Sequence, residues 1–302
     1  AQQITSFADF ERKYGGLSKD SLVSYAVQQF FMNGGQSAIV VRIAQGASQA
    51  EVTLNSLSVP NNPSTSVMRV IAKEPGAWAN GMTITVDYDT PLPDSTFNLK
   101  VLDLSTGQRE SFLSLSMNPD SRHNASRVIN DTSKLISVDT DVSVFELIKD
   151  VKGKSIGSTG EIPILSALDK DHLQFMITLN ENDGPKLVTI YDGINKPQKP
   201  DDLKNRIKDA VRHLGTTADY RDFDVNATDN ELTLISGEKG SGSFVRVSRA
   251  NTLDAASVLK LGVSNGGKEI DAASYLRPTP NGTTSKSLNL DDLQFDRDRK
   301  IL

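Results

Sequence analysis

The sequence predicts a multidomain protein of mixed α and β structure, and three observations lead to this fold class. An N-terminal segment with helical spacing of apolar residues runs directly into the strand-like residues 38–44. Alternating, strand-like segments follow to about residue 138, and a mixture of hairpins and helices follows from about residue 139. The 302 residues fit two or three domains of ordinary size. We expect a partial α/β core in residues 1–44, a β-rich domain in 45–140, and an α+β insertion domain with a polar C-terminal tail in 141–302.

Two helices are predicted before residue 35. Ser6 can cap a short helix in which Phe7, Phe10 and Tyr14 share one face, and Gly15 and Gly16 end it. A second helix begins near Ser18 or Asp20. Its expected buried stripe contains Leu22, Ala26, Val27, Phe30 and Phe31. Gly34 is the expected C′ residue with positive φ, which closes this helix.

The strand that follows, "AIVVRIA" at residues 38–44, has almost no polar side. A run without alternation is typical of a strand covered on both faces, so Phe30 and Phe31 should be buried against it. Two helices can cover only part of such a strand. We therefore expect an unusually large apolar surface around Val40 and Val41, and further strands from another copy or from beyond residue 302.

The other two predicted domains have conventional patterns. In the β-rich domain, strands are expected at residues 67–72, 82–89, 97–104, 110–115 and 134–138, with one helix at about 121–130. In the third domain, the turn "NENDGP" indicates a hairpin, and "FDVNATDNELTLIS" indicates another. Pro200 should start a helix, "SFVRVSRA" should be a strand, and "TLDAASVLKLG" should be a capped helix that ends at Gly262.

Composition excludes several classes of function. The 33 Lys and Arg residues face 38 Asp and Glu residues, and no segment forms a basic patch, so a nucleic-acid partner is not expected. The absence of cysteine excludes disulfides, cysteine nucleophiles and thiolate metal sites. Apolar runs are too short for a membrane span, so direct membrane insertion is not expected either.

The sequence contains no convincing catalytic, cofactor or metal site. The three histidines, His123, His172 and His213, stand far apart in unlike contexts. "GVSNGGKE" at 262–269 nearly matches a phosphate-binding loop, but Glu269 replaces the required hydroxyl, and the loop follows a predicted helix instead of a strand. The acidic stretch "DYDTPLPD" lacks the glycine and bidentate glutamate of a calcium loop and is better explained as a strand-end turn. We therefore expect a protein that is not an enzyme and carries no cofactor.

Three parts of the sequence carry recognisable motifs. The first consists of the N-terminal stretches "FERKYGG" and "AVQQFFMNGGQSAIVVRI", and the second is the turn "PGAWAN". The third, a looser match, is "ESFLSLSMNPDSRHNASRVINDTSKLISV". In this combination the chain resembles the contractile tail sheath proteins of phages and phage-derived injection systems. The residues that match the family pattern are Phe10, Tyr14, Gly15, Gly16, Ala26, Phe30, Phe31, Asn33, Gly34, Gly35, Val40, Val41, Arg42, Ile43, Pro75, Gly76, Trp78 and Asn80.

This resemblance implies a mechanical function. Sheath subunits polymerise helically around an inner tube and contract to drive it through a target envelope, with the tube, baseplate and cap proteins as partners. It also implies synthesis in the bacterial cytoplasm and assembly into a phage tail or a tail-like particle, which stays in the cytoplasm or is released. Sheaths carry a C-terminal α/β region and terminal arms that are not recognisable here, so we expect a longer full protein. The alternative from the residues themselves is a β-rich, adhesin-like surface-binding module.

Overall fold

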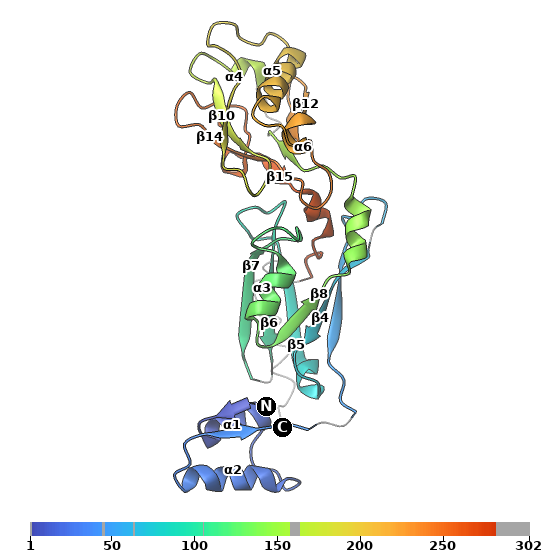
Figure 1. Ribbon diagram of the computed structural model, residues 1–302, viewed down its shortest axis with the longest axis vertical. Helices are drawn as coiled ribbons and strands as arrows, with labels where there is room; N and C mark the ends of the chain where they lie inside the picture. The colour runs from blue at the N-terminus through green and yellow to red at the C-terminus, as the bar shows by residue number, and fades with distance from the viewer. Residues whose placement is uncertain (1, 44–45, 63, 105, 158–163, 282–302) are drawn as a thin grey trace, which may run out of the picture.

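The computed structural model describes residues 2–43, 46–62, 64–104, 106–157 and 164–281. The protein has mixed α and β structure, with helices and several small antiparallel sheets arranged as a multidomain chain. Figure 1 shows an elongated molecule in which three units follow one another along the longest axis. We call them the N-terminal, middle and upper units.

The N-terminal unit is a two-stranded sheet covered by two helices. Strand β1 (Gln2–Ile4) pairs antiparallel with β2 (Ala38–Val40), and helices α1 (Phe7–Tyr14) and α2 (Leu22–Met32) lie between them in the chain. Ser6 caps α1 as predicted, since its hydroxyl accepts a hydrogen bond from the N–H of Asp9 at 3.1 Å. Ser21 caps α2 in the same way through the N–H of Val23.

The middle unit contains two three-stranded antiparallel sheets. The first has the order β3-β4-β8, formed by β3 (Glu51–Ser56), β4 (Thr65–Ala72) and β8 (Ile136–Asp139). The second has the order β5-β6-β7, formed by β5 (Met82–Asp87), β6 (Phe97–Asp103) and β7 (Arg109–Leu115). Helix α3 (Ala125–Thr132) contributes Ile129 to the shared core, and a 3-10 turn, η1 (Ala77–Gly81), precedes β5.

The upper unit contains a three-stranded and a four-stranded sheet. The first has the order β11-β10-β14, formed by β10 (Gln174–Thr178), β11 (Lys186–Thr189) and β14 (Arg246–Arg249). The second has the order β12-β13-β9-β15, formed by β9 (Lys154–Ile156), β12 (Asp224–Ala227), β13 (Leu232–Ile235) and β15 (Lys268–Ile270). Short helices α4 (Ile164–Ala167) and α6 (Ala218–Arg221) and the 3-10 turn η3 (Val263–Asn265) join these strands.

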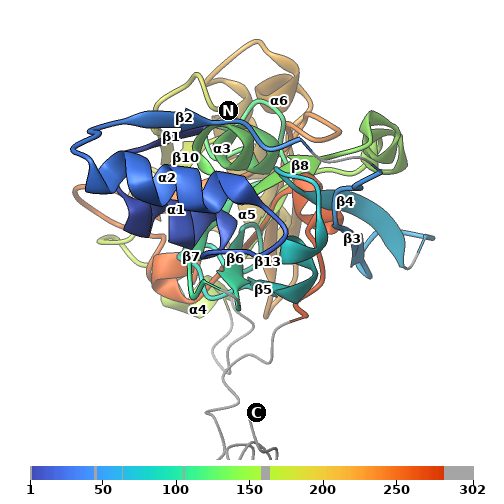
Figure 2. The same ribbon diagram turned by 90° about the horizontal axis from the view of Figure 1, so that it is seen from below.

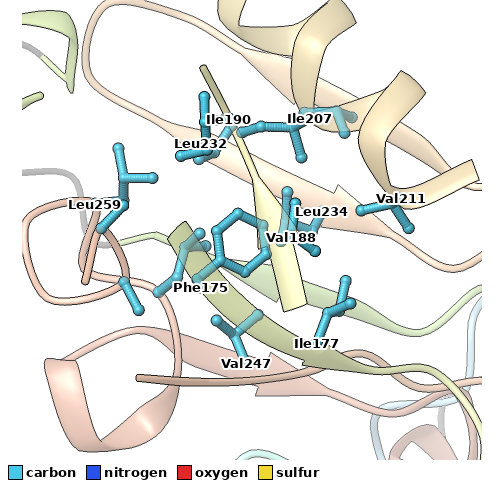
Figure 3. Close-up of a cluster of buried hydrophobic side chains, with 14 of the residues drawn as sticks. Phe175, Ile177, Val188, Ile190, Ile207, Val211, Leu232, Leu234, Val247 and Leu259 are labelled. Atoms are coloured by element: carbon cyan, nitrogen blue, oxygen red, sulfur yellow. The ribbon is translucent and has the colours of Figure 1, made fainter. Parts of the chain in front are cut away.

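Helix α5 (Pro200–Arg212) closes the core of the upper unit. Pro200 occupies its first turn, and Leu203, Ile207 and Val211 are fully buried on one stripe, as the sequence predicted. Figure 3 shows Ile207 and Val211 beside Val188 of β11 and Leu234 of β13, so this one helix covers residues of both sheets.

One predicted helix is wrong. Residues 252–261 form turns, with positive φ at Leu253 and Lys260. The carboxylate of Asp254 accepts hydrogen bonds from the N–H groups of Ala250, Ala256 and Ser257. These donors lie before and after Asp254 in the chain, so its side chain stabilises a loop in place of a helix. The apolar spacing reflects burial, because Ala255 and Leu259 belong to the core of the upper unit.

The middle and upper units are joined by two segments that pack on the middle core. The 3-10 turns η2 (Val142–Ile148) and η4 (Ala272–Leu276) place Val144, Ile148 and Leu276 in that core, although the sequence pattern grouped them with the third domain. At the joint, the Ser95 hydroxyl donates to the carbonyl of Glu269 at 2.6 Å and accepts from the N–H of Asp271.

Asp87, at the end of β5, provides a pH-dependent contribution to the stability of the middle unit. Partial burial alone would raise its pKa, but hydrogen bonds from Lys100 and Asn98 outweigh that effect and hold the pKa of Asp87 below its usual value. The Lys100 Nζ lies 2.7 Å from one carboxylate oxygen, and the Asn98 Nδ2 lies 2.6 Å from the other.

We therefore predict that Asp87→Asn lowers the free energy of unfolding at pH 7, and that this loss shrinks as the pH falls below about 4. The sign follows because a carboxylate with a lowered folded-state pKa stabilises the fold only while it is ionised. Urea unfolding followed by the fluorescence of Trp78, the single tryptophan, measures the difference. The effect should be smaller in a Lys100→Met background, and a loss that is independent of pH would contradict the prediction.

Candidate interaction surface

The N-terminal unit exposes more apolar side chains than it buries. Its buried cluster contains only Ile4, Phe10 and Val27, with Phe7, Tyr14, Phe31, Ala38 and Val40 packed partly against them. The exposed large apolar side chains of the same unit are Leu17, Leu22, Val23, Tyr25, Phe30, Met32, Ile39, Val41 and Ile43. Ile39, Val41 and Ile43 are 73%, 62% and 92% exposed. Soluble monomers rarely show such a concentration of exposed apolar side chains unless it serves an interaction.

Strand β2 is shorter and more exposed than predicted. It covers Ala38–Val40, whereas a strand through residue 43 or beyond was expected, and Ala44 lies outside the described residues. Within this chain, β2 pairs only with β1 in the described two-stranded sheet. The described part of the chain therefore covers this apolar run on one face only: Ala38 and Val40 pack against the small core, whereas Ile39, Val41 and Ile43 are exposed.

The prediction that Phe30 is buried is wrong for this chain. Phe30 is 43% exposed, whereas Phe31 is half-buried and packs against the small core. Ser24, Val27 and Phe31 recur at helical spacing and form the face of α2 that meets the core, and Phe30 lies about 100° away from Phe31 around the helix. Figure 2 looks at this unit from below, with α1 and α2 in front of the rest of the molecule.

The Asn33-Gly34-Gly35 sequence ends α2 with a tight turn. Gly34 has φ +86°, as predicted, and the N–H of Gly35 donates to the carbonyl of Phe30 at 2.9 Å. Asn33 donates from its Nδ2 to the carbonyl of Gln29 at 2.7 Å. A Cβ atom on Gly35 would lie 2.4 Å from the Phe30 ring, so this glycine lets the ring fold back over the turn.

Two motif residues that are far apart in the sequence meet where the N-terminal and middle units join. The Arg42 guanidinium donates from Nη2 to the carbonyl of Pro75 at 2.7 Å. Gly76 has φ +124°, and a Cβ atom there would lie 2.4 Å from the same Nη2. Only glycine fits both the backbone conformation and the space under the guanidinium. Arg42, Pro75 and Gly76 therefore form one contact: Pro75 accepts the hydrogen bond from Arg42, and Gly76 leaves room for the guanidinium.

Trp78 and Asn80 complete the turn before β5. Trp78 donates from Nε1 to the carbonyl of Glu74 at 3.0 Å, and its ring packs partly against the middle core. Asn80 is exposed and lies beside an open cleft between the two sheets of the middle unit. This cleft has a volume of about 360 Å³ and is lined mainly by Val52, Val70, Ala72, Met82, Ile84 and Ile136. The sequence pattern gave no sign of the cleft.

The chemical motifs rejected from the sequence have structural roles. The "GVSNGGKE" stretch turns from η3 into β15, and Glu269 is buried with its carboxylate accepting from the N–H of Val247 at 2.7 Å. His172 contacts Asp169, and the His213 ring contacts the carbonyl of Asp209. Across the residues that the structure describes, no group of His, Cys, Asp or Glu side chains is arranged to hold a metal ion.

Comparisons with models of known protein families and with curated protein sequences found no match. None of the described helices is both long enough and apolar enough to cross a membrane.

We predict that Arg42→Ala and Gly76→Ala are not additive. Gly76→Ala should cost about 1–3 kcal/mol, because the backbone conformation is unfavourable for alanine and the methyl group displaces the guanidinium. Without the Arg42 side chain, the added methyl group displaces nothing, and only the backbone part of the cost remains. The double variant should therefore lose less stability than the sum of the two single losses. Trp78 fluorescence reports unfolding at this site.

Gly81→Ala is the matched control, since nothing lies within 4 Å of the position of its Cβ atom. It should change stability little in either background. Full additivity of the Arg42 and Gly76 variants would show that the two residues do not support each other.

Proposed function

We propose that this chain is a structural subunit of a contractile tail sheath, which polymerises with identical copies around an inner tube. The observation that carries the proposal is the apolar surface of the N-terminal unit, where Ile39, Val41 and Ile43 are mostly exposed. An apolar surface that the described residues of its own chain leave open would be stabilised by burial in an assembly. These exposed residues lie in the stretch that resembles the sheath family, so the exposure and the sequence resemblance point to the same part of the chain.

The arrangement of the units supports an assembly role. The N-terminal unit lies at one end of the elongated molecule, and the upper unit lies at the other (Figure 1). Contacts through the N-terminal unit would therefore leave the upper unit projecting away from the contact region. A helical tube needs a heterologous interface that does not close on itself, and an end-located surface suits that geometry.

The proposed mechanism is mechanical and needs no active site in this chain. Subunits held in an extended state would relax to a contracted state and drive the inner tube through a target envelope. The proposed partners are other copies of this chain, the inner tube protein, and baseplate and cap proteins. The proposed setting is a phage tail or tail-like particle assembled in the bacterial cytoplasm.

The test is electron microscopy of the purified protein with and without changes in the apolar surface. We predict hollow tubes for the wild type and none for Ile39→Asp combined with Val41→Asp, because burying two carboxylates in an apolar interface is unfavourable. Val142→Asp is the matched control: Val142 is 78% exposed on η2, outside the proposed interface, and the variant should still assemble.

Dispersed particles that bind a cell surface, with tubes absent under all conditions, would instead support the adhesin-like alternative. Tube formation by the Ile39→Asp, Val41→Asp variant would show that assembly does not require this apolar surface, and would contradict the proposal.

A further inference from the structure

Buried charged groups gather where the upper unit meets the middle unit. Glu269 of β15 is only 3% exposed, and Asp271, just after this strand, is buried as well. Arg246 of β14 reaches both acids. Figure 1 shows β15 at the end of the upper unit that lies next to the middle unit. Because Ser95 of the middle unit bonds to the backbone of Glu269 and of Asp271, the cluster belongs to the joint between the units.

The two acids make unequal contacts with Arg246. Asp271 and the guanidinium form a bidentate pair, with nitrogen–oxygen distances of 2.5 and 2.6 Å. Oε2 of Glu269 lies 3.7 Å from Arg246 Nε, which is too long for a hydrogen bond. One guanidinium therefore neutralises one carboxylate, and Glu269 is left as a surplus acid in a buried place, where an uncompensated charge is costly.

The neutral form of Glu269 has a partner for each of its oxygens. Oε1 accepts a hydrogen bond from the N–H of Val247 at 2.7 Å, which either protonation state can do. Ser155 of β9 pairs directly with Glu269 across the sheet, so both side chains lie on the same face. The Ser155 hydroxyl is fully buried and has no hydrogen-bond partner among the described residues. With Glu269 neutral, its O–H can donate to the Ser155 oxygen.

The electrostatic surroundings also favour the neutral acid. Burial is the main cause that raises the pKa of Glu269 above its usual value, and the charge of Asp271 adds to this effect, whereas Arg246 and a backbone hydrogen bond oppose it. Glu181, between β10 and β11, interacts with Arg246, and Arg277, after η4, interacts with the acid of the bidentate pair. The other contacts, from β9 and from the middle unit, are the uncharged serines.

We propose that Glu269 is a proton-binding switch at the joint: it is neutral in the closed joint, and its ionisation loosens β15 from β14 and from the middle unit. Ionised Glu269 would stand beside the carboxylate of Asp271 with one guanidinium for both charges. The side chain of Glu269 bonds to β14 and its carbonyl bonds to Ser95, so the same residue connects the proton site to the middle unit. This inference does not depend on the sheath proposal.

Amide hydrogen exchange at Val247 and Asp271 tests the switch, because their N–H groups bond to the Glu269 carboxyl and to Ser95. An acid with a raised pKa in the closed joint stabilises that joint while it is protonated, and the contribution is lost as the pH rises through this pKa. Protection, corrected for the intrinsic exchange rate, should fall about tenfold for each pH unit between the pKa of an open glutamate and that of buried Glu269. Strand β6 of the middle unit is the internal reference and should not change.

Glu269→Gln keeps the shape of the neutral acid and removes its ionisation. Protection at Val247 and Asp271 should equal that of the wild type at about pH 4 and exceed it at about pH 8. Burial also raises the pKa of Glu238 in the upper unit, but Glu238 titrates in both proteins, so the difference between them belongs to Glu269. Glu146→Gln is the matched control, since the Glu146 side chain is 73% exposed on η2, and it should leave the profile unchanged.

Carbon-13 NMR of the glutamate carboxyl groups supplies a second readout in the unaltered chain. The Glu269 signal, assigned by its loss in Glu269→Gln, should titrate at a higher pH than an ordinary exposed glutamate. Titration in the ordinary range or below it would overturn the proposal. Identical exchange profiles for the wild type and Glu269→Gln would also overturn it. So would lower protection of the variant at about pH 8, because the ionised carboxylate would then be the form that stabilises the joint.

Discussion

The N-terminal unit is too small to bury its own apolar residues. Two short helices and a two-stranded sheet enclose only Ile4, Phe10 and Val27. Burial of apolar surface is the main force that offsets the conformational entropy lost on folding. A unit of this size needs a further surface to pack against, and its exposed residues are concentrated on α2 and on the stretch from Ile39 to Ile43.

The middle and upper units do not share this constraint. Each encloses a core of more than twenty buried residues between its two sheets. They are also tied to each other by Ser95, which bonds to Glu269 in β15 and to Asp271 directly after it. Arg277 fixes the end of η4 on the middle unit, since its guanidinium lies 4.0 Å from the Tyr88 ring centre and donates to the carbonyls of Pro93 and Thr96. By contrast, the N-terminal unit contacts the middle unit through Arg42. Of the three units, the N-terminal unit therefore has the smallest core of its own.

The sequence predicted the local elements well where periodicity and turn chemistry agree. The helix from Pro200, the hairpin around 180–185 and the strands β4 to β8 of the middle unit follow from spacing and from Gly, Asn and Pro positions, whereas β3 (Glu51–Ser56) was not predicted. The predicted helix at 252–261 failed because its apolar spacing arises from a buried loop held by Asp254. Periodicity reports burial, and it cannot distinguish a helix from turns that bury residues at similar intervals.

The site was predictable in part. Arg42, Pro75 and Gly76 were singled out by their motifs, but only the fold brings the guanidinium over the glycine. The apolar character of Phe30 predicted a buried position, yet its side chain is largely exposed in this chain. An apolar pattern indicates that a side chain favours burial, but it does not say which molecule would cover it. The cleft between β3 and β5 could not be foreseen, because sheet edges depend on strand order.

Amide hydrogen exchange of Ile39–Val41, in dilute monomer and in the assembled state, measures directly whether the N-terminal unit is incomplete by itself. We expect fast exchange in the monomer, comparable to that of exposed loops, and strong protection once copies assemble. Protection of Ile39–Val41 in a monodisperse monomer, equal to that of the core strand β6, would contradict this expectation, because the N-terminal unit would then be complete by itself.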